Sequence, residues 1–153
     1  MQSQRQSTLA DLSVLYDEDF FEWTRRSAEL LRAGHLERAD IEHIAEEIED
    51  MGKRDLRGLD NRVEVLLIHL LKWQLQPEKR SRSWQTTVVS QRNRIKRLLR
   101  QSPSLRRKIY AHLAGNYEDA VNLAVIETGL PPSRFPRECP FTVEQILDPE
   151  FLP

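Results

Sequence analysis

The sequence predicts an all-α fold: a single-domain helical bundle of about four main helices, followed by a Pro-rich C-terminal tail with one short helix. Three observations support this class. No segment alternates apolar and polar residues with a period of two, as a half-buried strand would. Apolar residues instead recur at spacings of three and four, and the chain of 153 residues has the length of one domain. We therefore expect residues 1–15 to be an N-terminal arm and residues 16–153 to form one helical domain.

The first predicted helix begins at a cap, Asp17 or Asp19, and runs to Ala33. Gly34 follows directly and is a typical residue for the end of a helix. A second and longer helix is capped by Asp40. Its apolar positions begin with Ile41, Ile44, Ala45, Ile48 and Met51 and continue to Trp73, before Pro77 ends the helix.

Gly52 and Gly58 decide whether this stretch is one helix or two, because each costs about 1 kcal/mol in a helix interior. The apolar face stays in phase across both glycines, which favours one helix. A straight helix over residues 40–76 would be roughly 55 Å long. We expect one helix, bent between Gly52 and Gly58, because that length exceeds the width of a compact domain of this size.

The second half of this helix, Val63 to Leu75, is apolar on nearly every side. A helix of this kind is enclosed on every side. Two interpretations stay open: it is the central helix of the fold, or one of its faces contacts a second subunit. The interface candidates for the second interpretation are Val65, Ile68 and Leu71.

Two further helices complete the bundle. The third begins near Ser83 and ends at about Arg100, and Ser102 with Pro103 marks the start of the fourth, which ends at Gly129. Prolines then make residues 130–141 an extended tail. Thr142 and Gln145 have the spacing of a capping box, which predicts a short last helix.

Charge is distributed unevenly along the chain, although the formal net charge is only −1. Residues 79–108 carry 11 Lys and Arg and no Asp or Glu, whereas both flanking regions are acidic. Such a segment either binds a polyanion or neutralises an acidic helix within the fold. The candidate polyanion-binding residues are Arg80, Arg82, Arg94, Lys96, Arg97, Arg100 and Arg107.

Arg92 differs from these cations because it lies at the inner edge of its helix. A half-buried guanidinium needs a partner. We expect a structural polar pair of Arg92 with Glu46 or Glu49, provided that the two helices pack antiparallel.

Candidate chemistry is sparse. His43 and Glu47 share a helix face and are weak metal candidates, so a metal-binding bundle is an alternative reading. No catalytic residue and no cofactor is predicted, and Cys139 is expected to pack inward rather than to act as a nucleophile. A single cysteine and a polar start without a signal core favour the cytoplasm. No membrane span is expected, because no run of about 18 apolar residues occurs.

Several strings of the sequence form a distinctive combination. They are His69 to Gln74, Trp84 with Gln91 and Arg92, Ser102 to Leu105, Phe135 with Pro136, Cys139 to Phe141, and the acidic run Glu46 to Glu49. Together they resemble a bacterial family, domain-of-unknown-function family twenty-nine. The resemblance covers residues 14–153 and implies a small, cytoplasmic, helical bacterial protein. It implies no activity and no site residues.

The function expected from the sequence is therefore open between two classes, with an enzyme less favoured than either. The first is a helical protein that acts through contacts with itself or with another protein, as a homo-oligomer. The second is a nucleic-acid-associated accessory protein that uses the basic segment 79–108.

Overall fold

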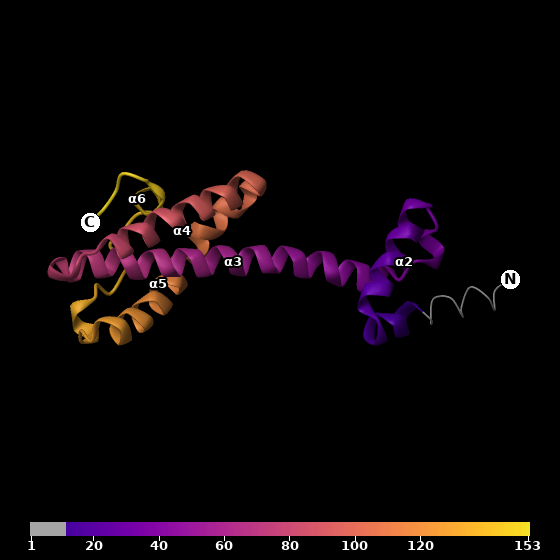
Figure 1. The fold of residues 1–153 in the computed structure, drawn as a ribbon, viewed down its shortest axis with the longest axis horizontal. Coiled ribbons are helices and arrows are strands. Elements are labelled where there is room, and N and C mark those ends of the chain that lie inside the picture. Colours follow the sequence, from indigo (N-terminus) through magenta and orange to yellow (C-terminus); the bar gives the residue numbers. More distant parts are fainter. Residues whose placement is uncertain (1–11) are drawn as a thin grey trace. The chain divides into compact units, whose positions relative to one another are not determined.

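The computed structural model describes residues 12–153, so most of the predicted N-terminal arm lies outside the described residues. Internal contacts divide the chain into two units, one up to Lys53 and one from Arg54 to Pro153. Residues 12–153 contain helices and no strand, which confirms the all-α fold (Figure 1).

The first unit contains a short helix over residues 12–18, α2 (Phe20–Arg32) and the beginning of α3 (Ile41–Leu75). The Asp19 side chain accepts a hydrogen bond from the backbone N–H of Glu22, which confirms Asp19 as the cap of α2. Gly34 has a φ of 74°, a conformation that favours glycine, directly after α2. Leu12, Trp23 and Ala39 are the buried apolar residues in the described part of this unit.

Helix α3 is uninterrupted through Gly52 and Gly58. The prediction of one helix rather than two is therefore confirmed, and the bend between these glycines stays a prediction. The apolar stripe in its first half is not covered as a core face would be. Ile41, Ile48 and Met51 are 49%, 64% and 61% exposed.

The second unit is built around the other half of α3. Residues Leu59 to Leu71 contribute seven buried side chains to one apolar cluster. The cluster also contains residues of α4 (Arg82–Gln101), α5 (Arg106–Thr128) and α6 (Val143–Leu147). Phe135 and Phe141 add two aromatic side chains from the Pro-rich segment.

This packing decides between the two interpretations of Val63 to Leu75. Ile68 and Leu71 are 3% and 0% exposed within a single chain, and Val65 is half-buried. The segment is the central helix of its unit, because its own chain encloses it. Ile68 and Leu71 therefore present no surface to a second subunit, and the expectation that they form an interface was wrong.

Local signals placed the remaining helices within a few residues. Helix α4 is capped by Ser81, whose side chain accepts a hydrogen bond from the N–H of Trp84. A short 3-10 turn, Pro103–Leu105, leads into α5, which ends at Gly129 with a φ of 71°. Thr142 and Gln145 form the predicted capping box of α6. Further 3-10 turns occupy Leu36–Arg38, Pro77–Lys79 and Pro132–Arg134.

In the described part of the chain, none of the helices is both long and apolar enough to cross a membrane.

Candidate functional site

The exposed face of α4 is the candidate site. Side chains spaced three and four apart along this helix line a shallow surface groove with a volume of about 700 Å³. Such spacing places them on one side of the helix. The lining residues are Arg82, Gln85, Thr86, Val89, Ser90, Asn93, Arg94 and Arg97. The groove thus combines three guanidinium groups with uncharged side chains that donate and accept hydrogen bonds.

All seven candidate polyanion-binding residues are exposed to solvent. In residues 12–153, none of the ion pairs involves a Lys or Arg from the basic segment 79–108. Arg80 alone among the seven is held by its own unit. Its guanidinium donates hydrogen bonds to the carbonyl oxygens of Trp73, at 2.9 Å, and Pro153, and it lies 5.1 Å from the centre of the Trp73 ring.

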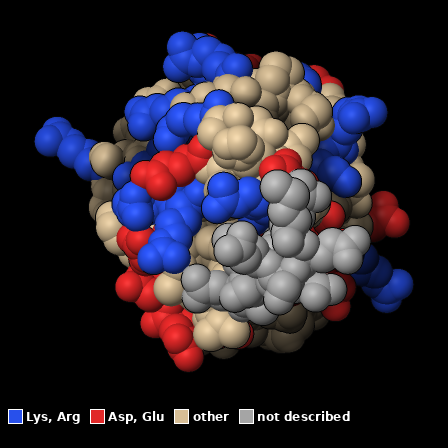
Figure 2. Space-filling model, turned by 90° about the vertical axis from the view of Figure 1, so that its right-hand side faces the viewer, with Lys and Arg blue, Asp and Glu red and all other residues tan. Residues whose placement is uncertain are grey.

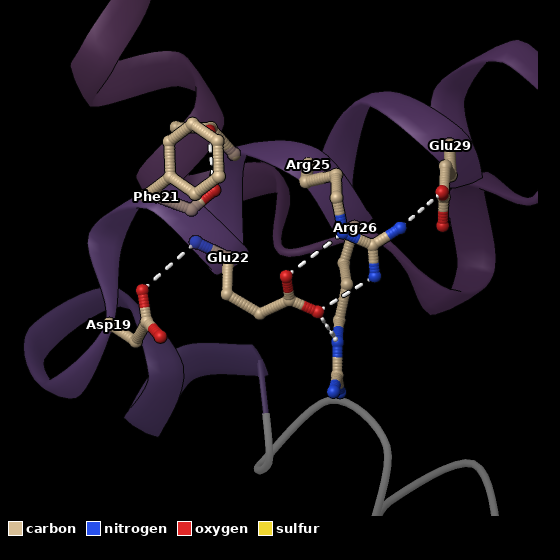
Figure 3. A network of polar contacts seen from close by, with 7 residues as sticks. Asp19, Phe21, Glu22, Arg25, Arg26 and Glu29 are labelled. Carbon is tan, nitrogen blue, oxygen red and sulfur yellow. Dashed lines mark hydrogen bonds and ion pairs between the residues drawn. The ribbon is translucent and has the colours of Figure 1, made fainter.

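The charged side chains of α2 are arranged differently, as Figure 3 shows. Glu22 accepts hydrogen bonds from Arg25, at 2.7 Å and 2.9 Å, and from Arg26, at 2.8 Å, while Arg25 also pairs with Glu29. Hydrogen bonds from the two arginines lower the pKa of the Glu22 carboxyl to about 2. In the view of Figure 2, Lys and Arg are likewise interspersed with Asp and Glu.

Arg92 is buried, as its position at the inner edge of α4 predicts, but its partners are different from the expected ones. Its Nε donates to the carbonyl oxygen of Ile146 at 2.8 Å, and its Nη2 donates to that of Gln145 at 3.2 Å. The predicted partners, Glu46 and Glu49, are exposed side chains in the first half of α3. The physical reason is that carbonyls in the last turn of a helix carry partial negative charge and can accept further hydrogen bonds, so they satisfy a buried guanidinium. The Gln145 oxygen also accepts a hydrogen bond from the N–H of Asp148 at 3.3 Å.

His43 and Glu47 are engaged in separate hydrogen bonds. The Nδ1 of His43 lies 2.6 Å from a carboxylate oxygen of Asp40, and Glu47 accepts a hydrogen bond from the Tyr16 hydroxyl at 2.6 Å. The bond to Asp40 raises the pKa of His43. The described residues contain no group of three or more His, Cys, Asp or Glu side chains placed to hold a metal ion.

Cys139 is half-buried, and its Sγ donates to the carbonyl oxygen of Phe141 at 3.4 Å. Burial raises the pKa of this thiol, which disfavours the nucleophilic thiolate.

Another polar cluster joins α3 to α5. One carboxylate oxygen of Asp60 accepts a hydrogen bond from the side-chain amide of Asn116 at 3.0 Å. Each of the two Asp60 carboxylate oxygens lies 3.1 Å from the Nδ1 of His112. These contacts connect two helices of the second unit and explain why a polar side chain, Asn116, is buried there.

Sequence reasoning found the cations of the α4 groove but missed its uncharged members, Gln85, Thr86, Ser90 and Asn93. Their helical spacing from Arg82 does place these residues on the same face of α4. The residue types did not mark them as a site, because Ser, Thr, Asn and Gln are common on any solvent-exposed helix face.

A comparison with protein families gives one finding. The model of the family described as "Domain of unknown function DUF29" matches residues 15–152. No curated protein and no solved structure shows a significant match to the chain.

Proposed function

The chain belongs to this family of unknown function, and we propose that it binds nucleic acid through the exposed groove of α4. The observation that supports this proposal is the set of exposed cations on α4 that form no ion pair with a carboxylate among residues 12–153. An acid-free helix face of this kind attracts phosphates and releases their counterions when it binds them.

The dimensions of the face suit a nucleic-acid backbone. Arg82 and Arg97 lie at its two ends, and the rise of an α-helix separates their backbones by roughly 22 Å. This length spans several phosphates, and a helix of ordinary diameter fits the major groove of B-DNA. Between the two ends, Gln85, Ser90 and Asn93 supply neutral hydrogen-bonding groups, which commonly contact phosphate and sugar oxygens.

The test is fluorescence anisotropy of labelled DNA and RNA of mixed sequence, titrated with the protein across a salt series. We expect binding that weakens steeply as salt rises. The variant Arg94→Gln/Arg97→Gln removes two phosphate contacts and should lower the slope of log K against log salt by about 2.

A matched control carries the same loss of charge elsewhere. Arg134 and Arg137 are exposed, lie outside the basic segment, and belong to the same unit as α4. Arg134→Gln/Arg137→Gln should leave the slope unchanged. If this control weakens binding as much as the α4 variant does, net charge explains the binding and the proposed groove does not.

Self-association is a second candidate function, favoured by the exposed stripe of Ile41, Ile48 and Met51 on α3. Contiguous exposed apolar side chains are typical of protein interfaces. The proposed partner is a second copy of this chain, because this half of α3 is an amphipathic helix whose apolar stripe can pack against the same stripe of another copy. Light scattering should show a dimer that Ile48→Glu converts to a monomer. A monomer at high micromolar concentration of the unaltered protein would exclude this function.

A further inference from the structure

A second hollow in the 54–153 unit has a chemistry different from that of the α4 groove. It lies between α4, the beginning of α5 and the residues that follow α6, and its volume is about 380 Å³. Four cations line it: Arg92, Lys96, Arg100 and Arg106. Leu99 and Leu147 contribute apolar wall, and the lining contains no Asp or Glu. This volume falls within the range of small-molecule sites, roughly 300–1,000 Å³.

Arg92 gives this pocket a buried charge. Its side chain is more than nine-tenths buried, and its hydrogen bonds go to two neutral carbonyl oxygens rather than to a carboxylate. Burial lowers the pKa of the Arg92 guanidinium, while the charge of Asp148 acts in the opposite direction without forming an ion pair. A buried guanidinium that contacts no carboxylate is costly, so an anion beside it would be stabilising.

Arg92 also has a hydrogen-bond donor group, Nη1, without an acceptor among the described residues. A guanidinium has five N–H donors, and the Nη1 group of Arg92 makes no hydrogen bond to a described residue. The fully buried side-chain atoms without a partner in residues 12–153 are Ser27 Oγ and Gln91 Oε1, so Arg92 Nη1 is still accessible. The pocket is the space that the Arg92 side chain lines.

The charges define the class of ligand. The negative charge of Asp148 stabilises the charged form of Arg92 through space. Glu144 forms a hydrogen bond with Tyr110, which also interacts with Arg106. Two of the four positive charges therefore have an acidic neighbour, and two are uncompensated. A phosphate monoester carries a charge of about −1.5 to −2 near pH 7 and accepts hydrogen bonds from arginine in a bidentate manner.

We propose that this pocket binds a phosphate monoester with an apolar or aromatic body. The phosphate contacts Arg92, Lys96 and Arg100, and the apolar body lies against Leu99 and Leu147. This chemistry has two sources, a free organic phosphate and the terminal phosphate of a nucleic-acid strand. Asn93 lines both hollows, but Arg92, Lys96 and Arg100 do not line the α4 groove, so this proposal does not depend on the proposed function.

Isothermal titration calorimetry of the full chain with phenyl phosphate and with inorganic phosphate tests the proposal. Phenyl phosphate should bind at least tenfold more tightly, because only it reaches the apolar wall. Lys96→Gln/Arg100→Gln should weaken phenyl phosphate by about tenfold or more, since each charge-assisted hydrogen bond contributes roughly that factor. Both side chains are exposed on α4, so the variant should fold normally.

Arg94→Gln/Arg97→Gln is the matched control, because it removes two charges from the same helix outside the pocket. It should change the affinity for phenyl phosphate by less than about twofold. Equal weakening by both variants would overturn the proposal, as would no heat of binding at 10 mM phenyl phosphate in low salt.

The source of the phosphate is distinguished by short oligonucleotides with and without a 5′-phosphate. A preference of tenfold or more for the phosphorylated strand, lost in Lys96→Gln/Arg100→Gln, assigns the pocket to a strand end. Equal binding of both oligonucleotides, together with tight binding of phenyl phosphate, assigns it to a free organic phosphate.

Discussion

Helices α2 and α4 are both rich in charged residues, but Arg25 and Arg26 of α2 are paired with acidic residues of the same helix and the cations of α4 are not. On α2, Glu22 lies three and four residues before Arg25 and Arg26, so each cation has an acidic neighbour on its own helix. On α4 the whole acid-free segment offers no such neighbour, and Arg94 and Arg97 extend into solvent. Local pairing of opposite charges leaves little field to attract a partner, whereas unpaired charges of one sign create a binding surface.

The strongest way to break this contrast is to give α4 the pairing that α2 has. Thr86→Glu/Ser90→Glu places a carboxylate four residues from Arg82 and four residues from Arg94, at exposed or half-buried positions. No arginine is removed, yet nucleic-acid affinity should fall by about tenfold or more, because the added carboxylates occupy the cations and repel phosphates. Anisotropy at constant salt measures this effect. Thr86→Gln/Ser90→Gln is the neutral control, and a similar loss there would attribute the effect to shape rather than charge.

The next largest effect concerns the one cation of α4 that faces inward. Arg92→Leu removes the hydrogen bonds to the carbonyls of Gln145 and Ile146. It leaves the Ile146 oxygen without a donor among residues 12–153, whereas the Gln145 oxygen keeps the N–H of Asp148 at 3.3 Å. We expect the free energy of unfolding to fall by about 1–3 kcal/mol. Arg94→Leu, at an exposed position, should change it by no more than about 0.5 kcal/mol. Urea denaturation measures both, and equal effects would show that burial does not distinguish the two arginines.

His43 should make the stability of the first unit depend on pH. The exposed arginines of α4 should give the second unit no such dependence. The bond to Asp40 raises the pKa of His43 above its unfolded value of 6.5. This contribution to stability is therefore complete below pH 6.5 and is lost as the pH rises through the folded pKa. Histidine NMR should give a pKa above 6.5 that returns toward 6.5 in Asp40→Asn. An unchanged pKa in that variant would contradict the assignment.

The smallest effect is expected at Glu22, whose two arginine partners are exposed on the surface of α2. Its pKa of about 2 means that its pairing with Arg25 and Arg26 is intact above the unfolded value of 4.5 and is lost as the pH falls toward 2. Carboxyl NMR titration checks this value. Arg25→Gln/Arg26→Gln should return the pKa of Glu22 to about 4.5, and a pKa that stayed near 2 would show that the arginines are not its cause.

Short-range features were predictable because their causes lie within a few residues. The cap at Asp19, the helix end at Gly129 and the capping box of Thr142 and Gln145 each depend on neighbours in the sequence. The exposure of the cations on α4 was predictable for a similar reason, since helical spacing assigns each side chain to a face.

Long-range features were not predictable in this way. The partners of Arg92 lie more than 50 residues further along the chain, in a helix of five residues. An amphipathic pattern on α3 identified the stripe from Ile41 to Met51, but a pattern does not say what covers it. The pocket beside Arg92 depends on where residues after α6 return to α4, which no local rule fixes.

The contribution of the last segment to the core has a consequence for biosynthesis. Phe141 and Ile146 pack in the same cluster as Leu59 and Leu66, which a ribosome makes roughly 80–90 residues earlier. At roughly 5–20 residues per second, the apolar half of α3 leaves the ribosome several seconds before this last part of its covering is synthesised, whereas α4 and α5 follow sooner. During that interval the apolar cluster around Leu59 is only partly covered, so this protein should be a substrate for the chaperones that bind emerging apolar segments.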